Sequence, residues 1–360
     1  MQAASQGKAG LPATGKISSG VFERVVMRRL GAADDAVLVG PYPGVDIGIV
    51  SVAAGQVMAV TCDPVFVVPD FGWERASWFA VHILASDAAT SGLAPRWMTV
   101  DLNLPPAAGD DDLAQLWEAF SAACEDLGIA VVGGHTARYE GCNWPMVGGA
   151  TCMAVGPQDA YVTPRMGRPG DVIVVTKGPA IEATALFAMA FPERLAQALG
   201  AATVGAAAGL FDKMTVVPDC RLASAFGLRR NGVTSMHDAT EGGVVGALFE
   251  VANASGTGLR ADLSALPVPP AVRDVCDHVG IDPFRAISEG TLVATVVPER
   301  SEELVDAFAE SGIPAAVVGE LVEPGEGQRL TGADGAAAVG PGGPDPFWAA
   351  FASWAGSEGL

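Results

Sequence analysis

Basic residues are scarce in this sequence. It contains 21 Lys and Arg against 41 Asp and Glu, which gives a formal net charge of −20 at pH 7. The phosphates of a nucleic acid and the anionic face of a membrane attract cationic surfaces and repel anionic ones. We therefore expect no nucleic-acid partner and no adhesion to anionic lipid. An acidic chain can still hold divalent cations, which then bridge to a phosphate ligand.

Paired cysteines and long apolar runs are also absent. The six cysteines are scattered between Cys62 and Cys276 without a CxxC pair, so there is neither a zinc-ligand signature nor a dense disulfide framework. No apolar stretch reaches the length of about 18 residues that a membrane span needs, so no membrane partner is expected. The opening MQAASQGKAGLPATGK lacks the apolar region of a secretion signal, and we interpret residues 1–16 as a flexible Gly-rich arm of a cytoplasmic protein.

Apolar residues and glycine are abundant. Half of the 360 residues are apolar and 45 are Gly, which is typical of a compact α/β or α+β protein with a sizeable core. The segment 162–171, with prolines and glycines among charged residues, is the best domain boundary. We predict an N-terminal domain over residues 17–160, a C-terminal domain over 168–323, and a Gly-rich tail with an apolar patch over 324–360.

Four polar side chains of the N-terminal half lie at predicted strand ends or among small residues. They are Asp46 in GVDIGIV, Asp63 in TCDPV, Asp87 in ASDAATSG and His135 in VVGGHT. Strand ends and glycine-flanked loops gather at one edge of an α/β sheet, where ligands bind. Aspartates gathered there repel one another unless they share a cation, and Mg²⁺ prefers such oxygen ligands. Each residue taken alone can equally be a turn former or a helix cap.

The stretch SMHDATEGGVVGALFEVANASG combines a His-Asp pair with two glycines and then a helical apolar pattern. Asp238 is a candidate metal ligand. Gly242 and Gly243 would let the backbone approach an anion near the helix N-terminus. The alternative is a helix with an acidic capping region and no ligand.

Taken in order, these pieces resemble the PurM/AIR-synthase-like superfamily. The matching segments are GVDIGIV, AVTCDPVF, ASDAATSGLAPRWMTVDLNLP, VVGGHT, PGDVIVVTKG, MHDATEGGVVGALFEVANASGTG and AISEGTLVATV. They run from about Gly15 to Leu321 and so cover most of the chain. MHDATEGGV together with SEGTL resembles the HypE branch, whose members serve hydrogenase maturation, most closely.

The resemblance implies a two-domain α/β (α+β) fold. The N-terminal domain would pair with its copy in a homodimer through a β-barrel interface, and a C-terminal α/β domain would cover the active site. ATP would lie between the domains, its phosphates held through Mg²⁺. The metal ligands at the matching positions are Asp46, Asp63, Asp87 and Asp238. The predicted cofactor-binding residues are these four together with Lys16, Gly133, Gly134, Thr136, Gly242 and Gly243.

Two features depart from the superfamily pattern. His135 stands where many members have an acidic residue, which replaces a hard anionic ligand by an imidazole. The HypE branch carries a terminal cysteine that receives a carbamoyl group, whereas this sequence ends in Ser357-Glu358-Gly359-Leu360 and its last cysteine is Cys276. We therefore expect a HypE-like paralogue that does not run the thiocyanate reaction on its own tail.

The resulting hypothesis is an enzyme that uses Mg-ATP to phosphorylate an amide, thioamide or similar oxygen of a small-molecule substrate. His135 and His237 are candidate general bases, and Glu289 in SEGT is a candidate for orienting the substrate. The alternatives are a non-catalytic dimeric ATP-binding sensor or maturation scaffold, a reaction of the AIR-synthetase or thiamine-phosphate-kinase type, and a degenerate member that binds nothing.

Overall fold

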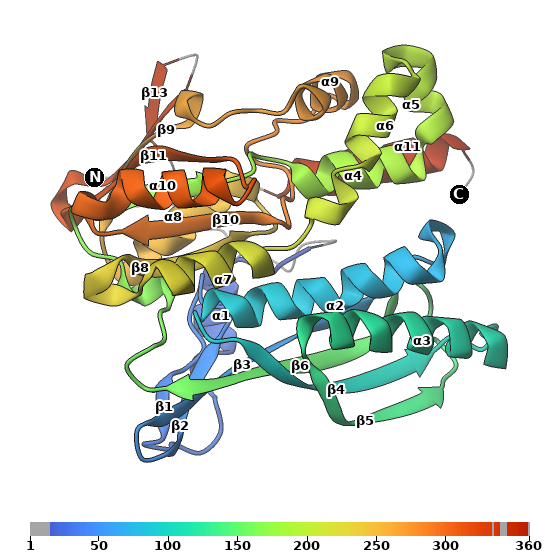
Figure 1. Ribbon diagram of the computed structural model, residues 1–360. Helices are drawn as coiled ribbons and strands as arrows, with labels where there is room; N and C mark the ends of the chain where they lie inside the picture. Colours follow the sequence, from blue (N-terminus) through green and yellow to red (C-terminus); the bar gives the residue numbers. More distant parts are fainter. Residues whose placement is uncertain (1–14, 333–334, 339–343, 359–360) are drawn as a thin grey trace, which may run out of the picture.

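Two α/β domains stacked on each other make up the chain (Figure 1). The computed structural model describes residues 15–332, 335–338 and 344–358. Most of the predicted N-terminal arm lies outside the described residues, which begin at Gly15. No described helix combines the length and the apolar character that crossing a bilayer requires.

The N-terminal domain is built on a six-stranded sheet with the order β1-β2-β3-β6-β4-β5. Its elements are α1 (Ser19–Val25), β1 (Val37–Val39), β2 (Gly48–Ala53), β3 (Gln56–Phe66), α2 (Trp73–Thr90), β4 (Pro95–Leu104), α3 (Asp110–Leu127), β5 (Ala130–Arg138) and β6 (Met146–Pro157). Helices α2 and α3 cover the face of the sheet that is turned toward the second domain (Figure 1). The sheet of the single chain is open, with β1 and β5 at its edges.

Strand β3 carries one of the predicted ligands into the seam between the domains. Its burial alternates, so that Val57, Ala59 and Thr61 face the core. The sequence pattern places Asp63 just past the end of a strand, but β3 continues to Phe66. The period of two therefore places Asp63 within the strand, on the same face as Thr61.

The C-terminal domain is built on a seven-stranded sheet with the order β13-β12-β9-β11-β7-β10-β8. Its elements are β7 (Val172–Thr176), α4 (Ile181–Ala190), α5 (Pro192–Leu199), α6 (Ala201–Ala208), α7 (Val217–Phe226), β8 (Val233–Ala239), α8 (Gly243–Ser255), β9 (Gly258–Asp262), α9 (Pro270–Val279), β10 (Thr291–Val296), α10 (Ser301–Glu310), β11 (Ala315–Val322), β12 (Gln328–Gly332), β13 (Gly335–Ala338) and α11 (Pro346–Glu358). Strand β8 is an edge strand of this sheet, yet all its residues are buried, because α2 of the first domain covers it.

The sequence pattern did not predict β8. The strand carries polar residues, among them Ser235, His237 and Asp238, and it is buried on both faces. Neither alternation nor a continuous apolar run marks such a strand. The consequence for the site is that His237 and Asp238 sit on a rigid strand at the domain seam.

Residues of the predicted tail take part in the second domain. Strand β12 pairs with β9, and α11 packs its aromatic side chains against α4. Phe347 and Trp354 are 2% and 8% exposed, and their rings lie 5.5 and 5.6 Å from that of Phe187. Because burying an aromatic side chain of this size contributes about 2 kcal/mol, α11 is an integral part of the core.

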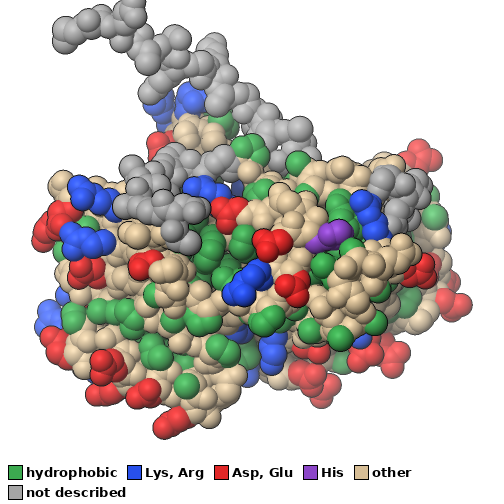
Figure 2. Space-filling view, turned by 90° about the horizontal axis from the view of Figure 1, so that it is seen from above, with side chains coloured by type: hydrophobic (Ala, Val, Ile, Leu, Met, Phe, Trp, Pro, Cys, Tyr) green, Lys and Arg blue, Asp and Glu red, His purple; other side chains and the backbone are tan. Residues whose placement is uncertain are grey.

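The negative charge of the chain is not gathered in one outer patch on the face seen from above. Figure 2 shows acidic and basic side chains interspersed there. A group of carboxyl side chains lies in the seam between the domains, where burial and mutual repulsion both act on it.

Candidate active site

A pocket of about 200 Å³ lies between the two domains. Its described lining residues are Lys16, Asp46, Thr61, Cys62, Asp63, Ile83, Asp87, Glu182, Thr240, Glu241, Ile287, Glu289 and Trp348. Six of these side chains are acidic and one, Lys16, is basic. An anion would therefore be repelled from this pocket unless cations entered with it.

Carboxyl groups from separate segments converge on this pocket. Asp46 lies just before β2, Asp63 within β3 and Asp87 in α2. Thr61 Oγ1 donates a hydrogen bond to Asp87 Oδ2 at 2.8 Å, which ties α2 to β3. Asp238, near the end of β8, lies next to this group, and its charge raises the pKa values of Asp63 and Asp87.

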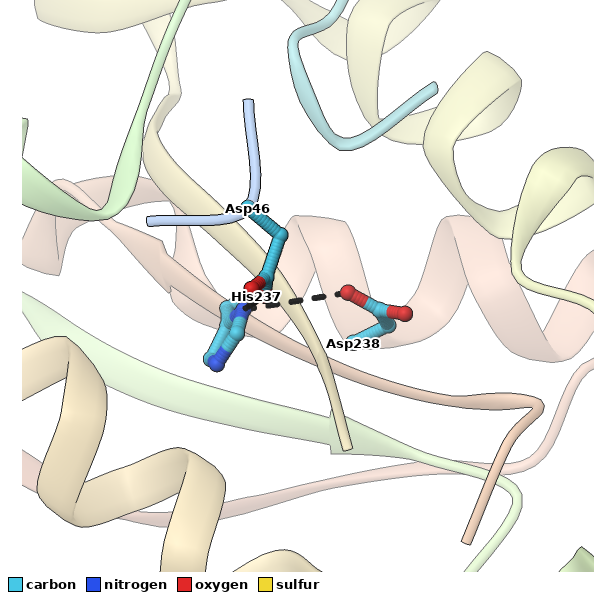
Figure 3. A group of neighbouring side chains, drawn as sticks. All are labelled: Asp46, His237 and Asp238. Carbon is cyan, nitrogen blue, oxygen red and sulfur yellow. Dashed lines mark ion pairs between the residues drawn. The ribbon is translucent and has the colours of Figure 1, made fainter. Parts of the chain in front are cut away.

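Asp46, His237 and Asp238 form a compact group (Figure 3). His237 Nδ1 lies 3.7 Å from Asp46 Oδ2 and 3.7 Å from Asp238 Oδ1. The other ring nitrogen, Nε2, is 2.9 Å from Glu250 Oε2 on α8. A carboxylate that holds the far nitrogen of an imidazole is the usual support of a metal-binding histidine. The group can hold a divalent cation, or the protonated imidazole can itself neutralise the two carboxylates.

Burial leaves several of these carboxyl groups without solvation. Both oxygens of Asp238 are buried and accept no hydrogen bond from the residues that the structure describes. Burial, followed by the charge of Asp238, raises the pKa of Asp87 well above its ordinary value. Burial likewise raises the pKa of Asp63 to about 6 and also raises that of Asp238. Oxygen atoms that are buried and unpartnered are what a bound cation would satisfy, so the donor set fits Mg²⁺.

The basic groups of the site are already engaged with its acids. Asp46 is the main cause that raises the pKa of Lys16, whose Nζ donates to Thr240 Oγ1 at 3.1 Å. Burial would raise the pKa of Asp46, but Lys16 and His237 hold it below its ordinary value. Burial lowers the pKa of His237, but the hydrogen bond and charge of Glu250, together with the charges of Asp46 and Asp238, outweigh it and raise this pKa to about 9. The imidazole is therefore protonated at neutral pH, where it cannot act as a base.

Sequence reasoning missed Glu182, in the first turn of α4. Its Oε2 accepts a hydrogen bond from the backbone N–H of Glu289 at 3.0 Å, and burial raises its pKa to about 7. Glu289 Oε1 is buried and has no hydrogen-bond partner among the described residues, and burial raises the pKa of Glu289 well above its ordinary value. Acidic residues are common in the first turn of helices because of the helix dipole, so the sequence carried no signal for Glu182.

The GGHT motif lies within β5, the edge strand, and lines no part of this pocket. Its residues are Gly133, Gly134, His135 and Thr136. The His135 imidazole is exposed, and its Nε2 lies 3.0 Å from the Tyr139 hydroxyl. A Cβ on Gly134 would overlap the Val100 carbonyl oxygen, so this glycine serves the close pairing of β5 with β4. The contact of these residues with a nucleotide stays a prediction.

The two glycines before α8 position the start of that helix. Gly242 N–H donates to Asp345 Oδ2 at 2.7 Å, so a carboxylate of this chain occupies the place that the sequence predicts for an anion. Gly243 has φ +60°, and a Cβ on it would lie 2.6 Å from Ala286 O and 2.7 Å from Phe284 O. Only glycine allows that approach. A contact of either glycine with a nucleotide stays a prediction.

A larger cleft of about 1260 Å³ lies beside the linker between the domains. Its basic lining residues are Arg165, Arg168, Arg229 and Arg230. Arg229 donates to the carbonyl oxygens of Tyr161 and Gln158, both at 2.9 Å, and so joins the two domains. None of the predicted site residues lines this cleft, and the smaller acidic pocket is the better candidate active site.

The raised pKa values predict how the metal-free protein responds to pH. The ordinary values of Asp63, Glu182 and His237 are 3.8, 4.5 and 6.5, and the folded values are about 6, 7 and 9. Between each pair of values the folded state binds protons that the unfolded chain has released. The free energy of unfolding should therefore fall as pH rises from about 4 to about 9, as these groups lose their protons in turn.

Added Mg²⁺ should reverse this loss, because the metal binds the ionised carboxylates. Thermal unfolding followed with and without Mg²⁺ should show a larger rise in melting temperature at about pH 8 than at about pH 5. An equal rise at both pH values would contradict a metal site made of these carboxylates.

Relatives of this chain cover nearly its whole length. Residues 34–162 match the N-terminal domain, and residues 168–330 the C-terminal domain, of the AIR synthase related protein family. A carbamoyl dehydratase HypE of Rhizobium leguminosarum bv. viciae is 27% identical over 318 residues, which are 87% of this chain and 84% of that protein. A thiamine-monophosphate kinase of Halobacterium salinarum is 32% identical over 327 residues, which are 86% of this chain and 96% of that protein. A HypE crystal structure in complex with ATP shares the fold, with TM-score 0.66 and 21% identity over 93% of this chain and 97% of that chain.

The chain therefore belongs to the AIR synthase related protein family, and its two PurM-like α/β domains confirm the predicted fold class. HypE proteins from several bacteria, Escherichia coli among them, recur among its relatives. Within the family this chain is HypE-like, as its motifs predict.

Proposed function

We propose that this protein is an ATP-dependent enzyme that transfers the γ-phosphoryl group to an amide, thioamide or similar oxygen of a small molecule. The observation that carries the proposal is the convergence of Asp46, Asp63 and Asp87 at one pocket between the domains, with Asp238 next to them. The relatives support it, because a HypE binds ATP in its crystal structure and another relative is a thiamine-monophosphate kinase.

In this proposal Asp46, Asp63, Asp87 and Asp238 hold Mg²⁺, and Lys16 faces the phosphates. Bound Mg²⁺ would neutralise the charge of the triphosphate, which is the main requirement of phosphoryl transfer. Lys16 would add a positive charge at the same place, since it is the one basic residue among the described residues that line the pocket.

Glu182 is the proposed general base. It lines the pocket, and its pKa of about 7 is suited to accepting a proton at neutral pH. When an amide attacks, a bond forms between its oxygen and the γ-phosphorus, the bond to the ADP oxygen breaks, and the amide nitrogen gives its proton to Glu182. Glu289, whose backbone N–H holds the Glu182 carboxylate, would orient this base. His237 would stay protonated beside Asp46 and Asp238.

A homodimer belongs to this proposal, with the edge strand β5 as the contact surface. Val132 and Tyr139 are 58% and 46% exposed on or next to this strand, and the unpaired backbone groups of an edge strand are open to pairing with a second copy. Pairing of two copies there would bury the GGHT motif and could bring Gly133, Gly134, His135 and Thr136 toward the partner copy.

A kinase that releases its phosphorylated compound as the final product is the second candidate. It is favoured by the thiamine-monophosphate kinase relative, which is 32% identical. Product analysis separates the two, because a dehydratase or ligase consumes the phosphorylated intermediate and releases inorganic phosphate, whereas a kinase does not.

Calorimetric titration with ATP and Mg²⁺, together with a phosphate-release assay over amides, thioamides and alcohols, tests the proposal. We expect saturable ATP binding and acceptor-stimulated release of ADP. Binding without turnover across the whole panel would instead support a nucleotide sensor or scaffold, and the absence of ATP binding would contradict both.

A further inference from the structure

An apolar cavity adjoins the acidic pocket. Its volume is about 620 Å³, which lies in the range of small-molecule binding sites. Asp63, Ile83, Glu182, Ile287 and Trp348 line both spaces. The cavity, which we call the acceptor cavity, therefore opens at this shared end onto the place where the carboxyl groups converge.

The walls of the acceptor cavity are aromatic and aliphatic and come from both domains. The residues that define its shape are Phe66, Phe71, Trp144, Leu186, Met189 and Phe351. Its charged lining residues within the described part of the chain are the acids Asp63, Asp70 and Glu182, with no Lys, Arg or His among them. Such walls favour an apolar ligand body and disfavour an anionic one.

The shared end offers polar groups that a ligand could use. Trp348 Nε1 is buried, and no atom in the described part of the chain accepts a hydrogen bond from it. A carbonyl or hydroxyl oxygen of a ligand could accept from this N–H. Across the same end, Glu182 and Asp63 could accept from an N–H or O–H of the ligand. A buried donor without a partner is costly in a folded protein, so a ligand that satisfied it would gain affinity.

We propose that the acceptor cavity binds the molecule to be phosphorylated, an uncharged compound with an aromatic or branched apolar body and an amide or hydroxyl group at the shared end. The proposal rests on the proposed function for the role of this compound as the phosphoryl acceptor. The binding itself requires no nucleotide, because the cavity is complete without one.

The test is a calorimetric titration of the full chain, without nucleotide, with acetamide, benzamide and 2-naphthamide. We expect the affinity to rise at least roughly tenfold from acetamide to 2-naphthamide, because the added rings bury apolar area. Ala355→Phe places a ring at the cavity wall and should weaken 2-naphthamide binding at least roughly tenfold. Ala352→Phe, on the exposed face of the same helix, is the matched control and should leave that affinity unchanged.

Two results would overturn the inference: no saturable binding of either aromatic amide, or 2-naphthamide binding of equal strength in Ala355→Phe and the unsubstituted protein. Titration of the same samples with ATP and Mg²⁺ keeps this inference separate from the proposed function. ATP binding without aromatic-amide binding removes the acceptor cavity alone. Aromatic-amide binding without ATP binding supports the cavity as a ligand site and removes the proposed phosphoryl transfer.

Discussion

Asp87→Asn should lower ATP turnover roughly 10³-fold without unfolding the protein. Asparagine retains an oxygen that can accept the Thr61 hydrogen bond, but it lacks the negative charge that would hold a cation. The same change should make the metal-free protein at least as stable as the unsubstituted one at neutral pH. The reason is that burial and Asp238 together disfavour the ionised form of Asp87 in the folded state.

The comparison requires turnover, ATP affinity and melting temperature measured on the same preparation. Asp101→Asn is the control, since it removes the charge of an exposed aspartate on β4 that does not line the pocket. If Asp87→Asn kept more than about a tenth of the turnover, Asp87 could not be a metal ligand in the reaction.

Glu182→Gln should lower kcat roughly 10²- to 10⁴-fold while leaving ATP affinity nearly unchanged, because glutamine cannot accept the proton. The dependence of kcat on pH tests the role of Glu182 as a base more specifically. In the unsubstituted protein kcat should rise with pH through about 7, as Glu182 loses its proton, and this rise should disappear in the variant.

Glu193→Gln, on the exposed surface of the neighbouring α5, is the matched control for this substitution. A normal kcat in Glu182→Gln would rule out its role as the base. An unchanged pH profile in that variant would assign the titration to another group of the site.

The sequence drew attention to the candidate acidic ligands because each lies in a segment whose small residues and strand pattern are unusual. It could not show how those segments meet. Asp63 comes close to Asp87 because β3 continues past Thr61. Asp238 comes close to Asp87 because residues 233–239 form strand β8 at the domain seam. Strand β8 is stabilised by burial against α2 of the other domain, and such a tertiary effect leaves no periodicity to read.

Tertiary contacts also explain why sequence reasoning missed other residues of the site. Glu182 looks like an ordinary first-turn acid, and only burial at the domain seam changes its pKa. Asp345 belongs to a Gly-rich segment, and only the return of α11 to the core brings it to Gly242 N–H. The aromatic residues of α11 were visible as an apolar patch, but nothing in their spacing indicated that they wall a cavity.

A crystal structure with a non-hydrolysable ATP analogue and Mg²⁺ is the decisive measurement. We predict that the triphosphate lies in the acidic pocket and that its metal is bound by carboxylate oxygens of Asp87 and Asp238, with Lys16 next to the phosphates. Nucleotide density confined to the larger cleft, beside Arg165, Arg168 and Arg230, would contradict the assignment of the acidic pocket as the site of ATP chemistry.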